Sequence, residues 1–339
     1  MAVILGIESS CDDTAAAVIE GGKLLANVVA GQEIHRAWGG VIPELASRAH
    51  QENIVPVVAE ALKKSGKSVK DIDAIAFTQG PGLMGSLLVG SSFAKGLSHA
   101  MGKPLIAVNH MQAHILAHFI QDEQPRPQPQ FPFVCLTVSG GHTQLVLVKD
   151  AFTFEVLGET QDDAAGEAFD KTAKILGLPY PGGPLIDKHA AQGDATKYKF
   201  PEAQIADYGY SFSGLKTAVL YFVRDQSAAN PKFVEENLDD ICASVQASII
   251  RHLVNKLRKV IGGTNVKCIA LAGGVSANSG LRKAVHQLGE ELNVQVCIPP
   301  FAYCTDNAAM IAMAGHFQFE KEAFASLHVA PLARFSVSG

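Results

Sequence analysis

Two histidines, His110 and His114, are spaced so that they could bind one metal ion. Residues four apart on a helix share one face, with Cβ atoms roughly 5–6 Å apart, and two imidazoles so placed reach one ion at about 2.1 Å. Met111 stands where H-E-x-x-H metalloproteases carry the glutamate that acts as general base. A thioether accepts no proton, so the pair predicts a metal centre but not proteolysis.

Two imidazoles leave a metal site short of ligands, so the chain must supply a further donor. Asp306 begins a predicted helix over residues 306–319, near the end of the chain, and is one candidate. His142, in the sequence Ser-Gly-Gly-His-Thr, is another. Asp306 could instead cap its helix, and the residues alone leave these alternatives open.

Acidic and glycine-rich loops follow several predicted strands. Asp12 and Asp13 lie in the first of them, where paired carboxylates form either a solvated turn or a contact with an ion, a substrate or a proton. Glycine-rich turns occupy residues 79–85, 139–143 and 272–282. Glycine lets the backbone approach a phosphate, and helix N-termini offer free N–H groups. The turns are therefore candidates for nucleotide binding, with ordinary turn chemistry as the alternative.

The elements that position these residues form a weak internal repeat of strand, polar loop, strand, turn and strand. The predicted strands are residues 2–8, 15–19 and 23–29 in the first copy and residues 133–138, 144–148 and 152–157 in the second. Four prolines within residues 122–132 are incompatible with a helix or a central strand. We therefore expect a first lobe over residues 1–122, a linker over 123–132 and a second lobe over 133–339.

Helices alternate with four further predicted strands, residues 72–78, 105–108, 266–271 and 294–298. The predicted helices are residues 43–64, 85–100, 110–120, 234–261, 278–290 and 306–319. Alternating strands and helices predict an α/β protein, and two such lobes predict a ligand-binding cleft between them.

Composition excludes several classes of protein. The 339 residues are 47% hydrophobic, which excludes intrinsic disorder. A net charge of −5 excludes nucleic-acid binding by bulk positive charge and leaves only a local patch. Six cysteines without a C-x-x-C pair predict reduced thiols. With no long apolar run and no basic N-terminal region, we expect a cytoplasmic location.

Ten segments, in order along most of the chain, resemble the bacterial tRNA N6-adenosine threonylcarbamoyltransferases, the TsaD family. They are residues 6–14, 39–50, 79–83, 109–114, 138–143, 162–170, 180–184, 210–216, 272–278 and 305–306. The resemblance implies two ribonuclease-H-like lobes of the actin/sugar-kinase/Hsp70 (ASKHA) type. The implied reaction transfers the threonylcarbamoyl group from threonylcarbamoyl-adenylate to the exocyclic amine of the adenosine 3′ of the anticodon. The tRNAs are those that read codons beginning with A, and AMP is released.

The resemblance also implies roles for individual residues. His110, His114 and Asp306 would hold one divalent metal, usually iron and in some members zinc. The chemistry of the implied reaction gives Asp12 the role of orienting or deprotonating the attacking amine. The adenylate would be held by Thr137, Val138, Ser139, Gly140, Gly141, Asp170, Gly183, Asp187 and Asn278. The chain departs from the family pattern at two positions. Thr137 stands where archaeal and eukaryotic relatives have a metal-approaching tyrosine, and Asp13 stands where a glutamate is frequent.

Partners and rival functions complete the expectation. The family implies tRNA, the proteins TsaB and TsaE, and TsaC as the source of the adenylate. An ASKHA-type small-molecule kinase would share the loops, but it does not need a histidine pair, since Mg²⁺ prefers oxygen ligands. A non-catalytic, nucleotide-gated partner protein would keep the loops and could lose the metal ligands.

Overall fold

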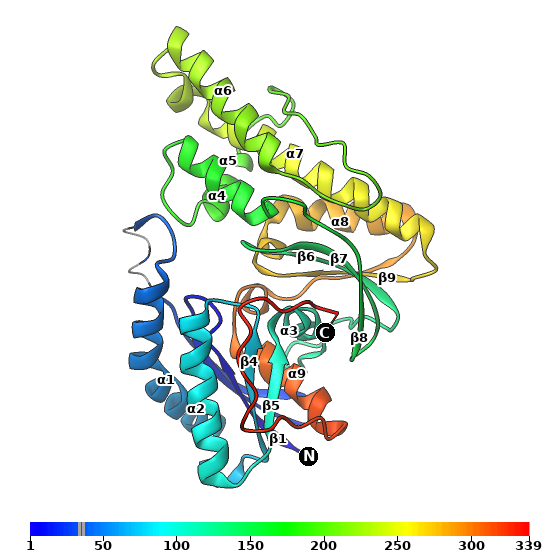
Figure 1. Ribbon diagram of the computed structural model, residues 1–339. Helices are drawn as coiled ribbons and strands as arrows, with labels where there is room; N and C mark the ends of the chain where they lie inside the picture. The colour runs from blue at the N-terminus through cyan, green and yellow to red at the C-terminus, as the bar shows by residue number, and fades with distance from the viewer. Residues whose placement is uncertain (33–34, 36–37, 339) are drawn as a thin grey trace. The chain divides into compact units, whose positions relative to one another are not determined.

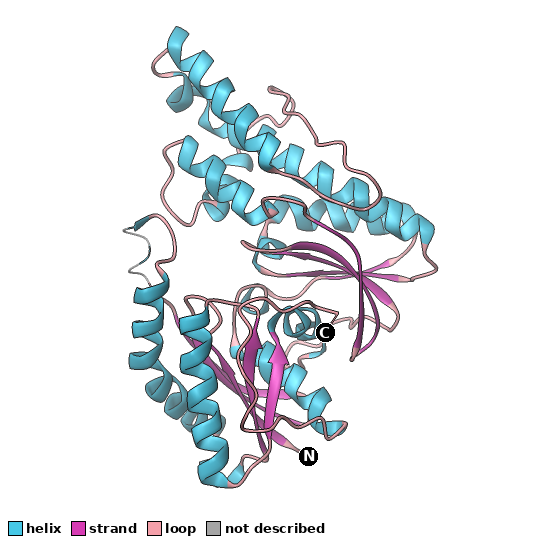
Figure 2. Ribbon diagram, in the orientation of Figure 1, coloured by secondary structure: helices cyan, strands magenta, loops and turns pink. Residues whose placement is uncertain are grey.

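The computed structural model describes residues 1–32, 35 and 38–338, which form two compact units. Unit 1 comprises Met1–Gln128, Ala151–Phe154 and Pro299–Gly339, and unit 2 comprises Pro129–Asp150 and Glu155–Ile298. Both units contain strands and helices (Figures 1 and 2).

Unit 1 is built on a five-stranded sheet in the order β3-β2-β1-β4-β5. The strands are β1 (Val3–Glu8), β2 (Thr14–Glu20), β3 (Lys23–Ala30), β4 (Ala74–Gly80) and β5 (Leu105–Asn109). The first three strands pair antiparallel, and β4 and β5 extend the sheet in parallel with β1. This arrangement brings the ends of β1, β4 and β5 to the same edge of the sheet.

Helices cover both faces of this sheet, and all six residues of β1 are buried. The helices are α1 (Pro43–Ser65), α2 (Met84–Met101), α3 (His110–Leu116) and α9 (Ala308–Glu320), with short 3₁₀ turns η2 (Val69–Asp71), η3 (Ala117–Phe119) and η5 (Phe301–Tyr303). Because side chains alternate along a strand, Leu5 and Ile7 join the core formed with α1. Gly6 faces α9, where a Cβ on it would lie 2.6 Å from the Ala308 carbonyl oxygen.

The division of the chain differs from the expected one because Ala151–Phe154 and the last 41 residues, Pro299–Gly339, belong to unit 1 rather than to the second lobe. Helix α9 packs on β1, β2 and β4 of the first sheet. Gly315 of α9 comes so close to β4 that a Cβ on it would lie 2.5 Å from the Ala76 Cβ. The chain therefore returns to unit 1 after completing unit 2, which a boundary based on chain order could not predict.

Unit 2 repeats the strand order of unit 1, as β10-β9-β6-β7-β8. Its strands are β6 (Phe133–Val138), β7 (Thr143–Asp150), β8 (Thr153–Glu159), β9 (Cys268–Ala272) and β10 (Gln295–Cys297). Its helices are α4 (Ala165–Ile175), α5 (Gly183–Ala190), α6 (Ser213–Ala229), α7 (Phe233–Gly263), the 3₁₀ turn η4 (Gly274–Ala277) and α8 (Ser279–Leu292). Strands β6 and β7 pair antiparallel, and β6 and β9 pair parallel. The predicted internal repeat is therefore confirmed at the level of sheet topology.

Among the described residues, no helix is both long enough and apolar enough to cross a membrane.

Candidate metal centre and nucleotide-binding loops

The histidine pair lies on the short helix α3, which begins directly at the end of β5. Asn109, the last residue of β5, caps this helix, and its Oδ1 accepts hydrogen bonds from the backbone N–H groups of Met111 (2.9 Å) and Gln112 (3.2 Å). The cap fixes the first turn, so His110 and His114 present their rings on one face. Met111 is 2% exposed, and no carboxylate stands at its position.

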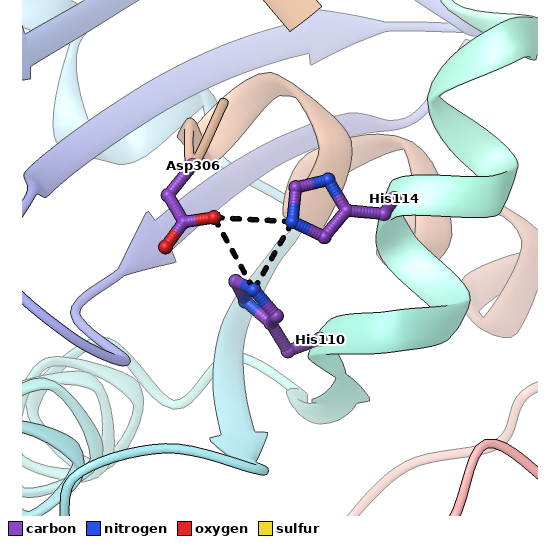
Figure 3. A group of neighbouring side chains, drawn as sticks. All are labelled: His110, His114 and Asp306. Atoms are coloured by element: carbon purple, nitrogen blue, oxygen red, sulfur yellow. Dashed lines mark hydrogen bonds and ion pairs between the residues drawn. The ribbon is translucent and has the colours of Figure 1, made fainter. Parts of the chain in front are cut away.

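The third member of the group is Asp306, which comes from the segment before α9 (Figure 3). Its Oδ1 lies 3.0 Å from His114 Nε2 and 3.3 Å from His110 Nε2. The two Nε2 atoms are 3.1 Å apart. Asn307, rather than Asp306, caps α9, because its Oδ1 accepts from Met310 N at 3.1 Å. Asp306 therefore does not cap this helix. The side chains of His110, His114 and Asp306 all belong to unit 1.

The three facing atoms fit a metal ion. Donors bonded to one ion at about 2.1 Å lie roughly 3.0–3.4 Å apart for bond angles between octahedral and tetrahedral values. The observed separations of 3.0, 3.1 and 3.3 Å fall within that range. Two imidazoles and one carboxylate suit both zinc and non-haem iron(II), so the donor set does not select between them. Within the described part of the chain, His142 does not join this group.

Glu8, which the sequence analysis missed, contacts His110 at Nδ1, the ring nitrogen that does not face Asp306. Its side chain is fully buried at the end of β1, and its Oε2 lies 3.1 Å from His110 Nδ1 and 2.5 Å from the Thr78 hydroxyl. Its Oε1 accepts from Ser10 N at 2.5 Å. A carboxylate on Nδ1 favours a proton there, which would leave the Nε2 lone pair free for a metal ion bound between His110, His114 and Asp306. The available signal was a glutamate ending a strand of otherwise apolar residues.

Charge compensation explains how these groups share a buried site. Burial raises the pKa of Glu8, but His110 outweighs burial and holds that pKa below its usual value. Burial lowers the pKa of His110, but the carboxylates of Asp306 and Glu8 raise it well above its usual value. Burial also opposes ionisation of Asp306, yet His110 and His114 hold its pKa far below the ordinary range. The histidines and the two carboxylates therefore stabilise one another's charged forms in this group.

The loop with Asp12 and Asp13 joins β1 to β2 in the same unit. Burial raises the pKa of Asp13 to about 7, and the carboxylates of Asp12, Asp306 and Glu8 act in the same direction. The loop is pinned by buried His50 of α1, whose Nε2 lies 3.0 Å from the Cys11 carbonyl oxygen. This bond gives a structural reason for the motif at residues 39–50.

In unit 2, the predicted adenylate loops follow the ends of β6 and β9. Thr137 and Val138 are buried at the end of β6. The hydroxyl of Ser139 accepts hydrogen bonds from the N–H groups of Gly141 (3.3 Å) and His142 (3.1 Å). These bonds organise the turn, in which Gly140 and Gly141 have open space at the position of a Cβ.

Glycine is required where the second of these loops approaches β6. Gly273 has φ +83°, and a Cβ on it would lie 2.5 Å from the Val138 carbonyl oxygen. The N-terminus of α4 also lies close to the residue that follows β6, since a Cβ on Gly166 would lie 2.5 Å from the Ser139 carbonyl oxygen. The turns predicted from residues 139–143 and 272–282 therefore meet in unit 2.

The other predicted adenylate residues have partners within unit 2. Asp170 Oδ1 accepts from the N–H groups of Gly182 (2.8 Å) and Gly183 (3.1 Å). Asp187 accepts from the backbone N–H and hydroxyl of Ser279, at 3.0 and 2.8 Å.

Asn278 is the N-cap of α8, because its Oδ1 accepts from Leu281 N at 2.9 Å. Its Nδ2 donates to Gln246 Oε1 at 2.7 Å. Asn278 therefore caps α8, and its contact with a nucleotide stays a prediction.

Solved structures share this architecture at low sequence identity. Component A of the (R)-2-hydroxyglutaryl-CoA dehydratase of Acidaminococcus fermentans superposes with a TM-score of 0.56 at 17% identity, covering 95% of this chain and 100% of that one. Full-length HypF, in a phosphate- and nucleotide-bound form, gives a TM-score of 0.62 at 13% identity, covering 96% of this chain and 47% of that one. With the repeated strand order, these likenesses confirm the ASKHA-type α/β fold class.

Sequence relatives are much closer. The protein of Christiangramia forsetii named tRNA N6-adenosine threonylcarbamoyltransferase is 58% identical over 332 residues, covering 98% of this chain and 97% of that protein. Proteins of the same name from Porphyromonas gingivalis and Thermosipho africanus are 54% and 51% identical, covering 99% and 94% of this chain and 98% and 95% of their own lengths. The sequence profile described as "TsaD: tRNA N6-adenosine threonylcarbamoyltransferase" matches residues 23–313. The chain therefore belongs to the TsaD family of tRNA N6-adenosine threonylcarbamoyltransferases.

Proposed function

We propose that this protein transfers the threonylcarbamoyl group of threonylcarbamoyl-adenylate to the N6 amine of the adenosine 3′ of the anticodon, in tRNAs that read codons beginning with A. The observation that carries the proposal is the convergence of His110, His114 and Asp306 in a chain of this family. In the reaction a bond forms between the amine nitrogen and the carbamoyl carbon. The bond from that carbon to the phosphate oxygen breaks, and AMP leaves with the electron pair.

His110, His114 and Asp306 would hold one divalent ion, which we propose to be Fe²⁺, with Zn²⁺ as the alternative. A bound divalent ion supplies a Lewis acid that polarises a carbonyl oxygen. The protein's own contribution is orientation: Glu8 holds a proton on His110 Nδ1, and the Asn109 cap fixes the turn that carries His110.

Asp12 is the residue we propose to orient the attacking amine and to accept the proton it loses. It lies on the loop between β1 and β2, whose Cys11 carbonyl is held by His50 and by the Ser86 hydroxyl at 3.0 Å. A fixed loop keeps a carboxylate in one place, which general base catalysis requires. The Asp12→Asn variant keeps the shape of the side chain and removes its basicity.

The loops of unit 2 are proposed to bind the adenylate through Thr137, Val138, Ser139, Gly140, Gly141, Asp170, Gly183, Asp187 and Asn278. Support comes from the glycine-rich turn of residues 139–141, where Gly140 and Gly141 carry no side chain that would keep a phosphate away from the backbone. Preorganised N–H groups would stabilise the charge on the departing phosphate.

Partners and location complete the proposal. The protein would act with TsaB and TsaE on tRNA, and TsaC would supply the adenylate, in the cytoplasm. A kinase is disfavoured because the donor set contains two nitrogens, whereas Mg²⁺ takes oxygen ligands. A metalloprotease is disfavoured by Met111.

Mass spectrometry of tRNA tests the function. Unmodified tRNA is incubated with the adenylate-forming protein and the partner proteins, with and without this chain. We expect threonylcarbamoyl-adenosine only when the chain is present, and its absence with the His114→Ala variant. Equal modification without the chain would refute the proposal.

A further inference from the structure

The segment of residues 330–337, here called the strap, runs along the edge of unit 1 at which β4 ends. Leu332 N donates to the Gln79 carbonyl oxygen at 2.8 Å, and Gln79 Nε2 donates to the Ala330 carbonyl oxygen at 2.9 Å. Gly82 N donates to the Ala333 carbonyl oxygen at 3.2 Å. The strap is therefore attached to residues 79–82 by two backbone hydrogen bonds and by one from the Gln79 side chain.

This attachment requires glycine at position 80. A Cβ on Gly80 would lie 1.9 Å from the Leu332 carbonyl oxygen and 2.9 Å from its carbonyl carbon. Both atoms belong to backbone, so no side-chain rotation could relieve the clash. The motif at residues 79–83 thus has a local role in seating the strap.

At the end of the strap, two carbonyl groups accept hydrogen bonds from the side-chain amides of residues on either side of His110. Asn109 Nδ2 donates to the Ser336 carbonyl oxygen at 2.7 Å, and Gln112 Nε2 donates to the Val337 carbonyl oxygen at 2.8 Å. The Val337 side chain is 1% exposed and anchors this end of the strap. Residues 332–334 are exposed, and Leu332 and Ala333 are held through their backbone groups, whereas Val337 is held by a buried side chain.

We infer that the strap positions the metal centre, and that Asn109, Gln112 and Val337 are positioning residues for it. The Asn109 amide donates to the strap through Nδ2 and caps α3 through Oδ1, so the strap fixes the orientation of the cap. The cap fixes the turn that carries His110, whose Nε2 is held 3.1 Å from that of His114. Metal sites tolerate misplacement of about 0.5 Å. The inference rests on the proposed metal centre.

The test measures binding of Zn²⁺ to metal-free, full-length protein by competition with a chelating dye. In Gln112→Glu, a carboxylate oxygen would face the Val337 carbonyl oxygen, and two acceptors repel. We expect the Kd for Zn²⁺ to rise about tenfold, at the lower end of the range for outer-shell changes. The matched control is Arg334→Ala, an exposed strap residue, which should bind Zn²⁺ as the wild type does.

A second variant, Val337→Asp, removes the strap anchor and should raise the Kd by a similar factor. Gln112→Glu and Val337→Asp interrupt the same series of contacts. We therefore expect the double variant to bind Zn²⁺ no more weakly than the weaker-binding single variant, whereas independent effects would add. Metal-free Gln112→Glu could have a lower melting temperature than metal-free Arg334→Ala. In that case the Kd of Gln112→Met is measured instead, because this variant removes the hydrogen-bond donor without adding charge.

The outcomes separate the strap from the metal centre. If the wild type binds one Zn²⁺ and the Gln112 variant matches Arg334→Ala in Kd, the strap inference is wrong and the centre stands. If the wild type binds no Zn²⁺ at this centre, both are wrong. A tenfold weaker Kd at an unchanged melting temperature supports the inference, because a merely structural contact would lower the melting temperature without a selective loss of metal.

Discussion

Glu8→Gln is the substitution that most sharply separates a metal-supporting carboxylate from a buried structural one. Glu8 accepts from three donors, the Ser10 N–H, the Thr78 hydroxyl and His110 Nδ1. Glutamine keeps the size but has only one oxygen. Turned one way, its NH₂ group faces the Ser10 N–H. Turned the other way, it faces His110 Nδ1 and favours the tautomer with a proton on Nε2, where the metal should bind.

The magnitude follows from these two orientations. Leaving the Ser10 N–H buried without an acceptor costs about 1–3 kcal/mol. Altering the partner of a ligating histidine costs about 10- to 100-fold in metal affinity, or about 1.4–2.8 kcal/mol of binding free energy. We expect a Kd for Zn²⁺ raised by that factor and a moderately lower melting temperature of the metal-free protein.

The assay is the same dye competition, with Thr78→Val as the control for Glu8. Thr78→Val removes one hydrogen bond to Glu8 but leaves the contact of Glu8 with His110, so it should bind Zn²⁺ nearly as the wild type does. A Glu8→Gln variant whose Kd lies within a factor of two of the wild type would refute the reasoning.

Three further predictions follow from neighbouring contacts. Asp306→Asn should fold normally, because Asn307 caps α9, and should lose most of its metal by elemental analysis; stoichiometric metal would remove Asp306 from the ligand set. Asn278→Ala should destabilise unit 2 by about 1 kcal/mol through the lost cap and should weaken AMP binding in calorimetry. Unchanged AMP affinity would leave Asn278 as a cap alone. Burial lowers the pKa of His252 below its usual value. Its stabilising contribution is therefore complete above the unfolded pKa and is lost as pH falls through it toward the folded pKa. The melting temperature of wild type should drop more than that of His252→Phe between pH 7.5 and 5.5, as calorimetry can check, and equal drops would contradict the assignment.

Local spacing carried most of what could be predicted from the sequence. The interval between His110 and His114 defines one helix face, so two of the three residues of the metal centre were evident without a structure. The repeat of strands was evident for the same reason, because its units are contiguous in the chain. Asp306 could be named as a donor, but its unit could not, since that depends on where α9 packs. Residues 308–315 are all buried, and this apolar character all round indicates a helix with more than one covered side.

Contacts between distant residues were beyond the reach of these patterns. Glu8 lies 102 residues from His110, and the strap residue Ser336 lies 227 residues from Asn109. Neither pair leaves a periodic signal in one sequence. The bond of Asn278 to Gln246 is a further example, because it depends on how α7 lies beside α8.

The most direct test of the central claim measures tRNA modification against metal content. Metal-free protein is supplied with Fe²⁺ or Zn²⁺ under anaerobic conditions, and threonylcarbamoyl-adenosine in tRNA is measured by mass spectrometry beside the metal bound per chain. We predict that modification rises with bound metal to one ion per chain, and that Asp306→Asn neither binds the ion nor modifies tRNA. Full modification by protein without metal, or by an Asp306→Asn variant that binds none, would contradict the assignment of this centre to the reaction.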